Sequence, residues 1–382
     1  MTRVLIAGSG VAAAEAALAL HALAGDHVEL ELLAPATELN ERPWSVLTPF
    51  GADAAPRVDL GRLVSDLGLR RHRDALEAVE TDAHTVVTRG GERLPYELLV
   101  IATGARSREA VPGAVTFRGP LSAGAVEGVL GRAERDPKVR LVFTAPRGAM
   151  WLLPLYELAL LSAARLRERG VADPDIAIVT PEPEPLAALG ATVTAAARAA
   201  LNDYDIDVIS GAEPSAAVAG ALQLRGGALV PANVVVALPE LVGPRVPGLP
   251  CDDRGFLPAD LHGRVRGVDD VFAAGDATSF EIKHGGLAAQ QADAAAECIA
   301  ARVGAIASAD AFRPIVRAML LAGDTPLYVT ADLAARAGVV SREPLWAPLD
   351  KIAGRYLSPY LASGQATGAM LKDRAVIRQP VR

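Results

Sequence analysis

The stretch Arg3-Val-Leu-Ile-Ala-Gly-Ser-Gly-Val-Ala-Ala-Ala-Glu15 decides the fold class of this chain of 382 residues. Its first five residues form the short apolar run that is typical of a buried parallel strand. Residues 11–24 are rich in alanine and predict a helix, and residues 28–33 predict a second strand. Because a strand, a glycine turn, a helix and a strand follow in this order, we expect a βαβ unit and an α/β fold.

The turn between the first strand and the helix has the pattern Gly8-x-Gly10-x-x-Ala13. Its glycines allow a tight turn and a close approach of the backbone to a pyrophosphate, which the N–H groups of the helix N-terminus can bind. An ordinary glycine-bearing turn is the alternative. Ala34 follows the second strand, where dinucleotide sites usually carry Asp or Glu. We therefore expect ribose binding to differ in detail or to use backbone and loop groups.

Two other apolar runs end in short turns. Residues 98–102 predict a strand followed by Thr103-Gly104, and residues 271–274 predict a strand followed by Gly275-Asp276. Ligands bind beyond the carboxyl ends of strands in such folds, so Asp276 is a candidate to bind a ligand hydroxyl. A plain Gly-Asp turn is the alternative.

A second α/β unit follows, with strands over 139–144 and 176–180 on either side of a helix over 155–169. The stretch 243–250 is rich in Gly and Pro and indicates a crossing between domains. Residues 312–330 predict a hairpin with its turn at 322–325. We expect two Rossmann-like domains and a C-terminal interface segment. Their borders are 1–112 with 244–310 for the first domain, 113–243 for the second, and 311–382 for the C-terminal hairpin and tail.

The composition narrows the range of functions. The chain carries 38 Lys and Arg against 45 Asp and Glu, a net charge of −7, which argues against a nucleic-acid or anionic-membrane binder. Two cysteines cannot build a disulfide framework, and the histidines lack metal-ligand spacing. No segment has the length of a membrane span or the flanks of a signal peptide. We expect a cytoplasmic protein without a metal and with at most peripheral membrane contact.

Three glycine motifs carry a resemblance to a known family. Gly8-Ser-Gly10, Ala102-Thr-Gly104 and Ala274-Gly-Asp276 occur in the order and spacing of the FAD-dependent pyridine nucleotide-disulfide oxidoreductase superfamily, which the chain resembles over about residues 3–330. The resemblance is closer to the branch of sulfide:quinone oxidoreductases, flavocytochrome c sulfide dehydrogenases and type II NADH dehydrogenases. Three further segments support this branch: Arg42-Pro43, Val179-Thr-Pro-Glu182 with Gly190, and Lys283-His-Gly-Gly-Leu-Ala-Ala-Gln-Gln-Ala292.

The resemblance implies bound FAD. Its pyrophosphate would lie on the first glycine turn, Arg42 near the adenosine or the phosphates, and Asp276 at the ribityl or pyrophosphate region. The helix that starts near Gly286 and the Lys283 ammonium would stabilise the negative charge of a reduced flavin, and no other residue is assigned to catalysis. The alternative for Lys283 is a solvated loop lysine, and we expect His284 to be a surface-loop histidine. The implied cofactor-binding residues are Gly8, Gly10, Val11, Ala12, Ala13, Ala34, Arg42, Ala102, Thr103, Gly104, Gly275, Asp276, Lys283, Gly286 and Leu287.

Two departures from the family leave the electron donor open. The second glycine fingerprint, which would bind NAD(P)H, is replaced by the stretch 144–154, in which Gly148 remains and Trp151 would crowd a pyrophosphate. NAD(P)H therefore stays an open candidate as a ligand. Glu182 could meet its ribose, although we expect an ordinary loop glutamate. The paired cysteines of sulfide-oxidising relatives have no match in Cys251 and Cys298.

The function that we expect is that of an FAD-dependent oxidoreductase. It would pass electrons from a small reduced donor through the flavin to a quinone or another small acceptor, and a homodimer is possible. The tail carries Trp346, Tyr356 and Tyr360, which could meet a quinone ring or a lipid interface, although packing inside the protein is the expected role. Two alternatives stay open. One is an oxidoreductase for another organic substrate, and the other is a flavin-binding redox-sensing or partner-binding module without efficient turnover.

Overall fold

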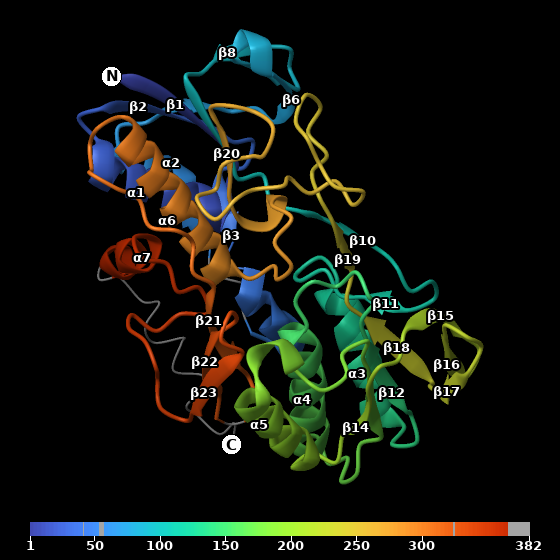
Figure 1. The fold of residues 1–382 in the computed structure, drawn as a ribbon. Helices are drawn as coiled ribbons and strands as arrows, with labels where there is room; N and C mark the ends of the chain where they lie inside the picture. The colour runs from blue at the N-terminus through green and yellow to red at the C-terminus, as the bar shows by residue number, and fades with distance from the viewer. Residues whose placement is uncertain (41, 53–56, 324, 366–382) are drawn as a thin grey trace.

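The computed structural model describes residues 1–40, 42–52, 57–323 and 325–365. Two parallel sheets, one in the upper and one in the lower half of Figure 1, form the frame of the molecule. Each sheet has five strands and is flanked by helices. The prediction of an α/β fold with two Rossmann-like units is confirmed.

The first sheet has the strand order β20-β9-β1-β2-β5, and all of its pairs are parallel. Its strands are buried apolar runs because both faces of the sheet are covered. Helices α1 and α6 pack against each other and against one face, where their alanines allow a close approach. The elements are β1 (Thr2–Ala7), α1 (Val11–Ala24), β2 (Val28–Leu33), β5 (Arg70–His72), β9 (Leu98–Ile101), β20 (Val271–Ala273) and α6 (Gly285–Arg302).

Smaller elements surround this sheet. One three-stranded antiparallel sheet covers its other face, and a two-stranded ribbon leads into a short helix. These elements are β3 (Glu38–Asn40), η1 (Arg42–Phe50), β4 (Arg57–Asp59), α2 (Leu60–Asp66), β6 (Leu76–Glu80), η2 (Thr81–Ala83), β7 (Thr85–Thr88), β8 (Arg93–Pro95) and η4 (Gly275–Ala277).

The second sheet has the order β11-β18-β12-β13-β14 and is also parallel. A three-stranded antiparallel sheet, β15-β16-β17, extends from it, and the ribbon β10-β19 joins it to the first half of the molecule (Figure 1). The elements are β10 (Arg106–Arg108), β11 (Val115–Thr116), α3 (Ala123–Arg135), β12 (Leu141–Thr144), α4 (Leu153–Glu168), β13 (Ile176–Val179), η3 (Ala187–Leu189), α5 (Ala191–Asn202), β14 (Asp207–Ile209), β15 (Pro214–Val218), β16 (Ala221–Leu224), β17 (Leu229–Pro231), β18 (Val234–Ala237) and β19 (Glu240–Val242).

The C-terminal part is an antiparallel sheet of β21 (Ile315–Leu320), β22 (Leu327–Asp332) and β23 (Ala337–Ser341), followed by α7 (Leu357–Gln365). The predicted hairpin is confirmed in β21 and β22, although position 324 of its turn lies outside the described residues. The third strand was not predicted. The first sheet takes its strands from residues 2–101 and 271–273, and the second takes them from residues 115–237. The predicted domain borders at 112 and 243 lie between these ranges, and they stay predictions, as does the border at 310.

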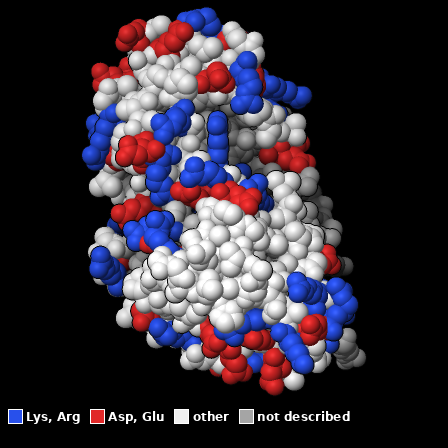
Figure 2. All heavy atoms as spheres, turned by 90° about the vertical axis from the view of Figure 1, so that its right-hand side faces the viewer, with Lys and Arg blue, Asp and Glu red and all other residues white. Residues whose placement is uncertain are grey.

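The surface seen from the side of the second sheet is unevenly charged. Figure 2 shows acidic and basic side chains mixed over its upper half and along its lower border, with a broad area between them that is free of Lys, Arg, Asp and Glu. Charges of both signs are therefore interspersed on this face, and no large area of it carries charges of a single sign.

Candidate cofactor site

Three turns meet at the carboxyl edge of the first sheet, because β20, β9 and β1 are neighbours in it. The first turn needs its glycine: a Cβ on Gly8 would lie 2.2 Å from the carbonyl oxygen of Ala102, which ends the neighbouring strand. A Cβ on Gly275 would lie 2.9 Å from Cβ of Ala12. The close contacts between these turns thus explain why small residues occupy them.

The N-terminus of α1 faces open space at the same edge. Gly10 is its N-cap, makes no side-chain cap, and would place a Cβ where no atom lies within 4 Å. Gly104 is equally open. The first N–H groups of a helix have no partner within it and carry a partial positive charge. This uncapped N-terminus with room in front of it fits an anionic group such as a pyrophosphate.

Charged side chains lie beside the turn after β20. Burial raises the pKa of Asp276, while the positive charges of Lys283 and Arg42 act in the opposite direction. Lys283 donates its ammonium to the carbonyl oxygen of Thr278, and its Nζ lies 4.2 Å from the ring centre of Phe256. Burial lowers the pKa of Lys283 to about 8, against the influence of Asp276. Lys283 is only 6% exposed, so the reading as a solvated loop lysine is wrong.

The predicted residues at the turns come together, whereas those at the end of β2 are covered. The Ala34 N–H donates to the His72 carbonyl oxygen at 3.0 Å, and the Arg71 guanidinium reaches the carbonyl oxygens of Ala34 and Ala36. Leu287 is 1% exposed and packs in a core. The turns and helix starts hold Gly8, Gly10, Val11, Ala12, Ala13, Ala102, Thr103, Gly104, Gly275, Asp276, Lys283 and Gly286, and their cofactor roles stay predictions.

The corresponding edge of the second sheet is filled by side chains. A Cβ on Gly148 would lie 2.5 Å from the side chain of Glu240, which pairs with Arg108 at 2.6 Å. The Arg254 guanidinium donates to the carbonyl oxygens of Gly148 and Leu241. The Glu240 side chain therefore occupies the space beside the remaining glycine, and a phosphate would have to displace it.

Two more contacts occupy the region around this edge. The Tyr156 hydroxyl donates to Glu182 at 2.5 Å, and burial raises the pKa of both groups. The interpretation of Glu182 as an ordinary loop glutamate was incomplete, because this bond holds it against α4. The rings of Trp151 and His284 meet edge to face at 4.9 Å, and the Lys283 N–H donates to the carbonyl oxygen of Met150. The stretch 144–154 thus packs on the start of α6.

His284 itself is buried, so the expectation of a surface-loop histidine is wrong. It is 6% exposed, and burial lowers its pKa to about 4, helped by the charge of Lys351. His284 is therefore neutral at pH 7. Its Nδ1 has no hydrogen-bond partner among the described residues.

The C-terminal segment closes over the same region through a buried ion pair that sequence reasoning missed. Lys351 Nζ lies 2.6 Å from Glu157 Oε1 on α4, and it also donates to the carbonyl oxygen of Pro43. Glu157 accepts a second bond from the Leu321 N–H. The pair ties the tail to α4, to η1 and to the residue after β21, and Lys351 lies 194 residues from Glu157 and 308 from Pro43. The sequence offered one signal, a lysine between the apolar residues 345–349 and 352–353.

A second buried contact fixes the tail on α1. Glu15 accepts hydrogen bonds from the N–H groups of Tyr356 and Leu357, at 2.7 and 2.8 Å. The Asp293 carboxyl on α6 lies beside Glu15, and burial together with the charge of Glu15 raises its pKa to about 8. Tyr356 is thus partly buried against the core at α1 and α6, and Leu357 after it is buried.

Neither a metal site nor a disulfide is found where the chain is described. No cluster of His, Cys, Asp and Glu in the described ranges could hold a metal ion. Cys251 and Cys298 are both free thiols. No described helix combines the length and apolar character needed to cross a membrane.

Comparison with known proteins agrees with this geometry. The chain superposes on the sulfide:quinone oxidoreductase of the hyperthermophilic bacterium Aquifex aeolicus with a TM-score of 0.79 at 19% identity, over 98% of this chain and 92% of that one. A ferredoxin reductase of Rhodopseudomonas palustris gives a TM-score of 0.64 at 18% identity, over 89% and 88%. The chain has the fold of the FAD-dependent pyridine nucleotide-disulfide oxidoreductases. This confirms the resemblance noted in the three glycine motifs.

One curated relative adds a sequence match. An NADH dehydrogenase-like protein of Mycobacterium tuberculosis (strain H37Rv) is 27% identical over 363 residues, which are 90% of this chain and 88% of that protein. No family model matches the chain.

Proposed function

We propose that this chain binds FAD at the carboxyl edge of the first sheet and works as an oxidoreductase. One observation carries the proposal. The uncapped start of α1 opens at Gly10 into free space, and the turns at Ala102 and Gly275 pack against it in the order that the fold family uses. The oxidoreductases among its relatives and fold neighbours support the same assignment.

The residues around the turns would hold the cofactor and its charge. The N–H groups of Val11 and Ala12 would bind the pyrophosphate, and Asp276 would accept a hydrogen bond from a hydroxyl of the ribityl chain. FAD supplies the two-electron chemistry, and its reduced form carries negative charge. Lys283 and the N-terminus of α6 would stabilise that charge. With a pKa of about 8, Lys283 is mostly protonated at pH 7.

The electron donor, in this proposal, is a small molecule that does not bind as a dinucleotide on the second sheet. Glu240 fills the space next to Gly148, and Tyr156 occupies Glu182. The free thiols Cys251 and Cys298 offer no disulfide to accept electrons. A quinone is the proposed acceptor, since the fold neighbour with a TM-score of 0.79 is named a sulfide:quinone oxidoreductase.

NADH is the second candidate donor. The relative that is 27% identical over 90% of this chain is named an NADH dehydrogenase-like protein, which favours this reading. NADH would then have to reach the flavin without a glycine-rich loop on the second sheet, through contacts that displace Glu240 or Trp151.

The test is an anaerobic visible spectrum of the purified protein after incubation with FAD. We expect a flavin band in the wild type and its loss in Gly10→Val, whose added side chain fills the free space in front of α1. Gly124→Val is the matched control, because Gly124 lies in the first turn of α3 and also has no atom within 4 Å of its Cβ position. Absence of flavin in the wild type, or flavin retained by Gly10→Val, would overturn the FAD assignment.

The same sample tests the electron donor and the electron acceptor in separate steps. Bleaching of the band by NADH would select the second candidate, and a band that NADH leaves unchanged supports a different donor. Flavin photoreduced by light with EDTA as the sacrificial electron donor bypasses the protein's own donor, and we expect a soluble quinone to reoxidise it without oxygen. Photoreduced flavin that the quinone leaves reduced would refute a quinone acceptor and favour a binding module without turnover.

A further inference from the structure

We propose that a cavity beyond the edge strand β20 is a second ligand site, for a small neutral aromatic molecule that carries a carbonyl oxygen. The cavity has a volume of about 690 Å³, within the range of small-molecule sites. None of the residues predicted to bind the flavin lines it. The proposal therefore goes beyond the FAD-dependent function and does not depend on it.

The walls of the cavity come from distant parts of the chain. The loop at 259–263, the segment 278–282 after η4, and residues 312–314 before β21 surround it, and the turn between β22 and β23 closes one end. Phe280 and Phe312 meet edge to face with ring centres 5.2 Å apart. The two rings stand at 78° to each other, and an aromatic molecule can pack against the face of one ring or the edge of the other.

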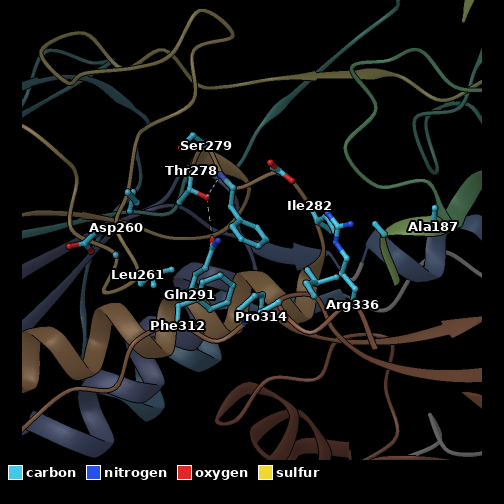
Figure 3. Close-up of a pocket in the computed structure, with 18 residues that line it drawn as sticks. Ala187, Asp260, Leu261, Thr278, Ser279, Ile282, Gln291, Phe312, Pro314 and Arg336 are labelled. Atoms are coloured by element: carbon cyan, nitrogen blue, oxygen red, sulfur yellow. Dashed lines mark hydrogen bonds between the residues drawn. The ribbon is translucent and has the colours of Figure 1, made fainter. Parts of the chain in front are cut away.

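A buried amide points its donor into the cavity. Gln291 on α6 is 8% exposed, and its side-chain oxygen accepts the Gly275 N–H at 2.7 Å and faces the Thr278 hydroxyl at 3.4 Å. These contacts fix which end of the amide is oxygen. The amide nitrogen is left without an acceptor among the described residues, and Figure 3 shows the end of the side chain at the cavity. A donor that opens into a cavity with aromatic walls can hydrogen-bond to an acceptor oxygen on a ligand.

The charges at the rim favour a neutral ligand. Arg336 extends into the cavity in Figure 3, and it can only donate hydrogen bonds. Glu281 also lines the cavity and offsets this charge. Asp260 is used by its own loop, where it accepts the N–H groups of His262 and Arg264 at 2.9 Å and pairs with the Arg264 guanidinium at 3.3 Å, which balances its charge. The lining thus offers donors to a carbonyl oxygen and no excess of one charge.

The cavity lies behind the turn that carries Asp276. Gln291 holds the N–H of Gly275, which directly precedes Asp276, and Thr278 lines the cavity while its carbonyl oxygen holds Lys283. A ligand that hydrogen-bonds to Gln291 therefore contacts the support of the predicted flavin turn from its other side.

The experiment measures binding of 1-tetralone and of tetralin, which lacks the carbonyl, by ligand-observed NMR on the full chain. We expect 1-tetralone to bind more tightly by about threefold to tenfold, the effect of one hydrogen bond. Gln291→Glu keeps the oxygen that Gly275 needs and removes the donor. It should weaken binding of 1-tetralone by a similar factor and leave tetralin unchanged.

A matched pair of variants tests the location. Ala334 lines the cavity and Ala335 does not, although both are exposed and both donate their N–H to Asp332. Ala334→Trp should weaken both probes at least tenfold, and Ala335→Trp should leave both unchanged. Equal binding of the two probes, an unaffected Ala334→Trp variant, or no binding to the wild type would overturn the proposal. The NMR signal requires no flavin, so a failed FAD assignment leaves this test intact.

Discussion

Replacing Asp293 by Asn tests the buried pair of carboxyl groups between α1 and α6. Burial raises the pKa of both Glu15 and Asp293. The two backbone N–H groups that Glu15 accepts favour its ionised form and so leave the shared proton on Asp293. The pKa of Asp293 is about 8 in the folded protein, against 3.8 for an ordinary aspartate. Asn has the same shape and a donor for Glu15, but it cannot ionise.

The sign of the effect follows from proton linkage. A carboxyl whose pKa is raised by folding gives its full stability below the unfolded pKa near 4 and loses it as the pH rises through about 8. Each pH unit between these values costs about 1.4 kcal/mol per proton. Between pH 6 and pH 8 the wild type should therefore lose roughly 2 kcal/mol that Asp293→Asn retains.

The assay is urea unfolding at pH 6, 7, 8 and 9, followed by tryptophan fluorescence. The titrating groups outside this pair are present in both proteins, so the difference in unfolding free energy reports on the coupled pair of Glu15 and Asp293. We expect Asp293→Asn to gain on the wild type up to pH 8 and to stay level above pH 9. Asp173→Asn, on an exposed loop, is the control and should follow the wild type. A difference that does not change with pH would refute the reasoning.

Two further predictions concern packing. Gly8→Ala should destabilise the protein by about 3 kcal/mol or more in urea, because its Cβ would lie 2.2 Å from the Ala102 carbonyl oxygen. Gly128→Ala, in α3 with open space around it, should instead stabilise by about 0.5–1 kcal/mol, and equal effects of the two would contradict this. Lys351→Met leaves Glu157 buried without its partner and should cost about 3–5 kcal/mol. The further change Glu157→Leu should recover part of that loss in a double-mutant cycle, and simple addition of the two losses would argue against coupling.

Local sequence signals placed the first elements correctly, whereas burial depended on distant segments. The first helix was expected over residues 11–24 and is found there, because glycine turns and apolar runs act on their own neighbours. The turn at Gly8-x-Gly10 could be predicted for the same reason. Lys283 and His284 could be placed near the start of α6, yet their burial could not be foreseen. It depends on Met150 and Trp151, more than 130 positions away.

The sequence by itself determined the parallel βαβ units, the glycine turns between strand and helix, and the missing second fingerprint. These features depend on periodicity and on backbone freedom within a few residues. Only the tertiary structure decided that Glu240 fills the space at Gly148, that Lys351 pairs with Glu157, and that Gln291 faces a cavity. A buried charge or amide needs a partner, but the energy of burial does not say which residue supplies it. That choice is made when chain segments up to hundreds of residues apart pack together.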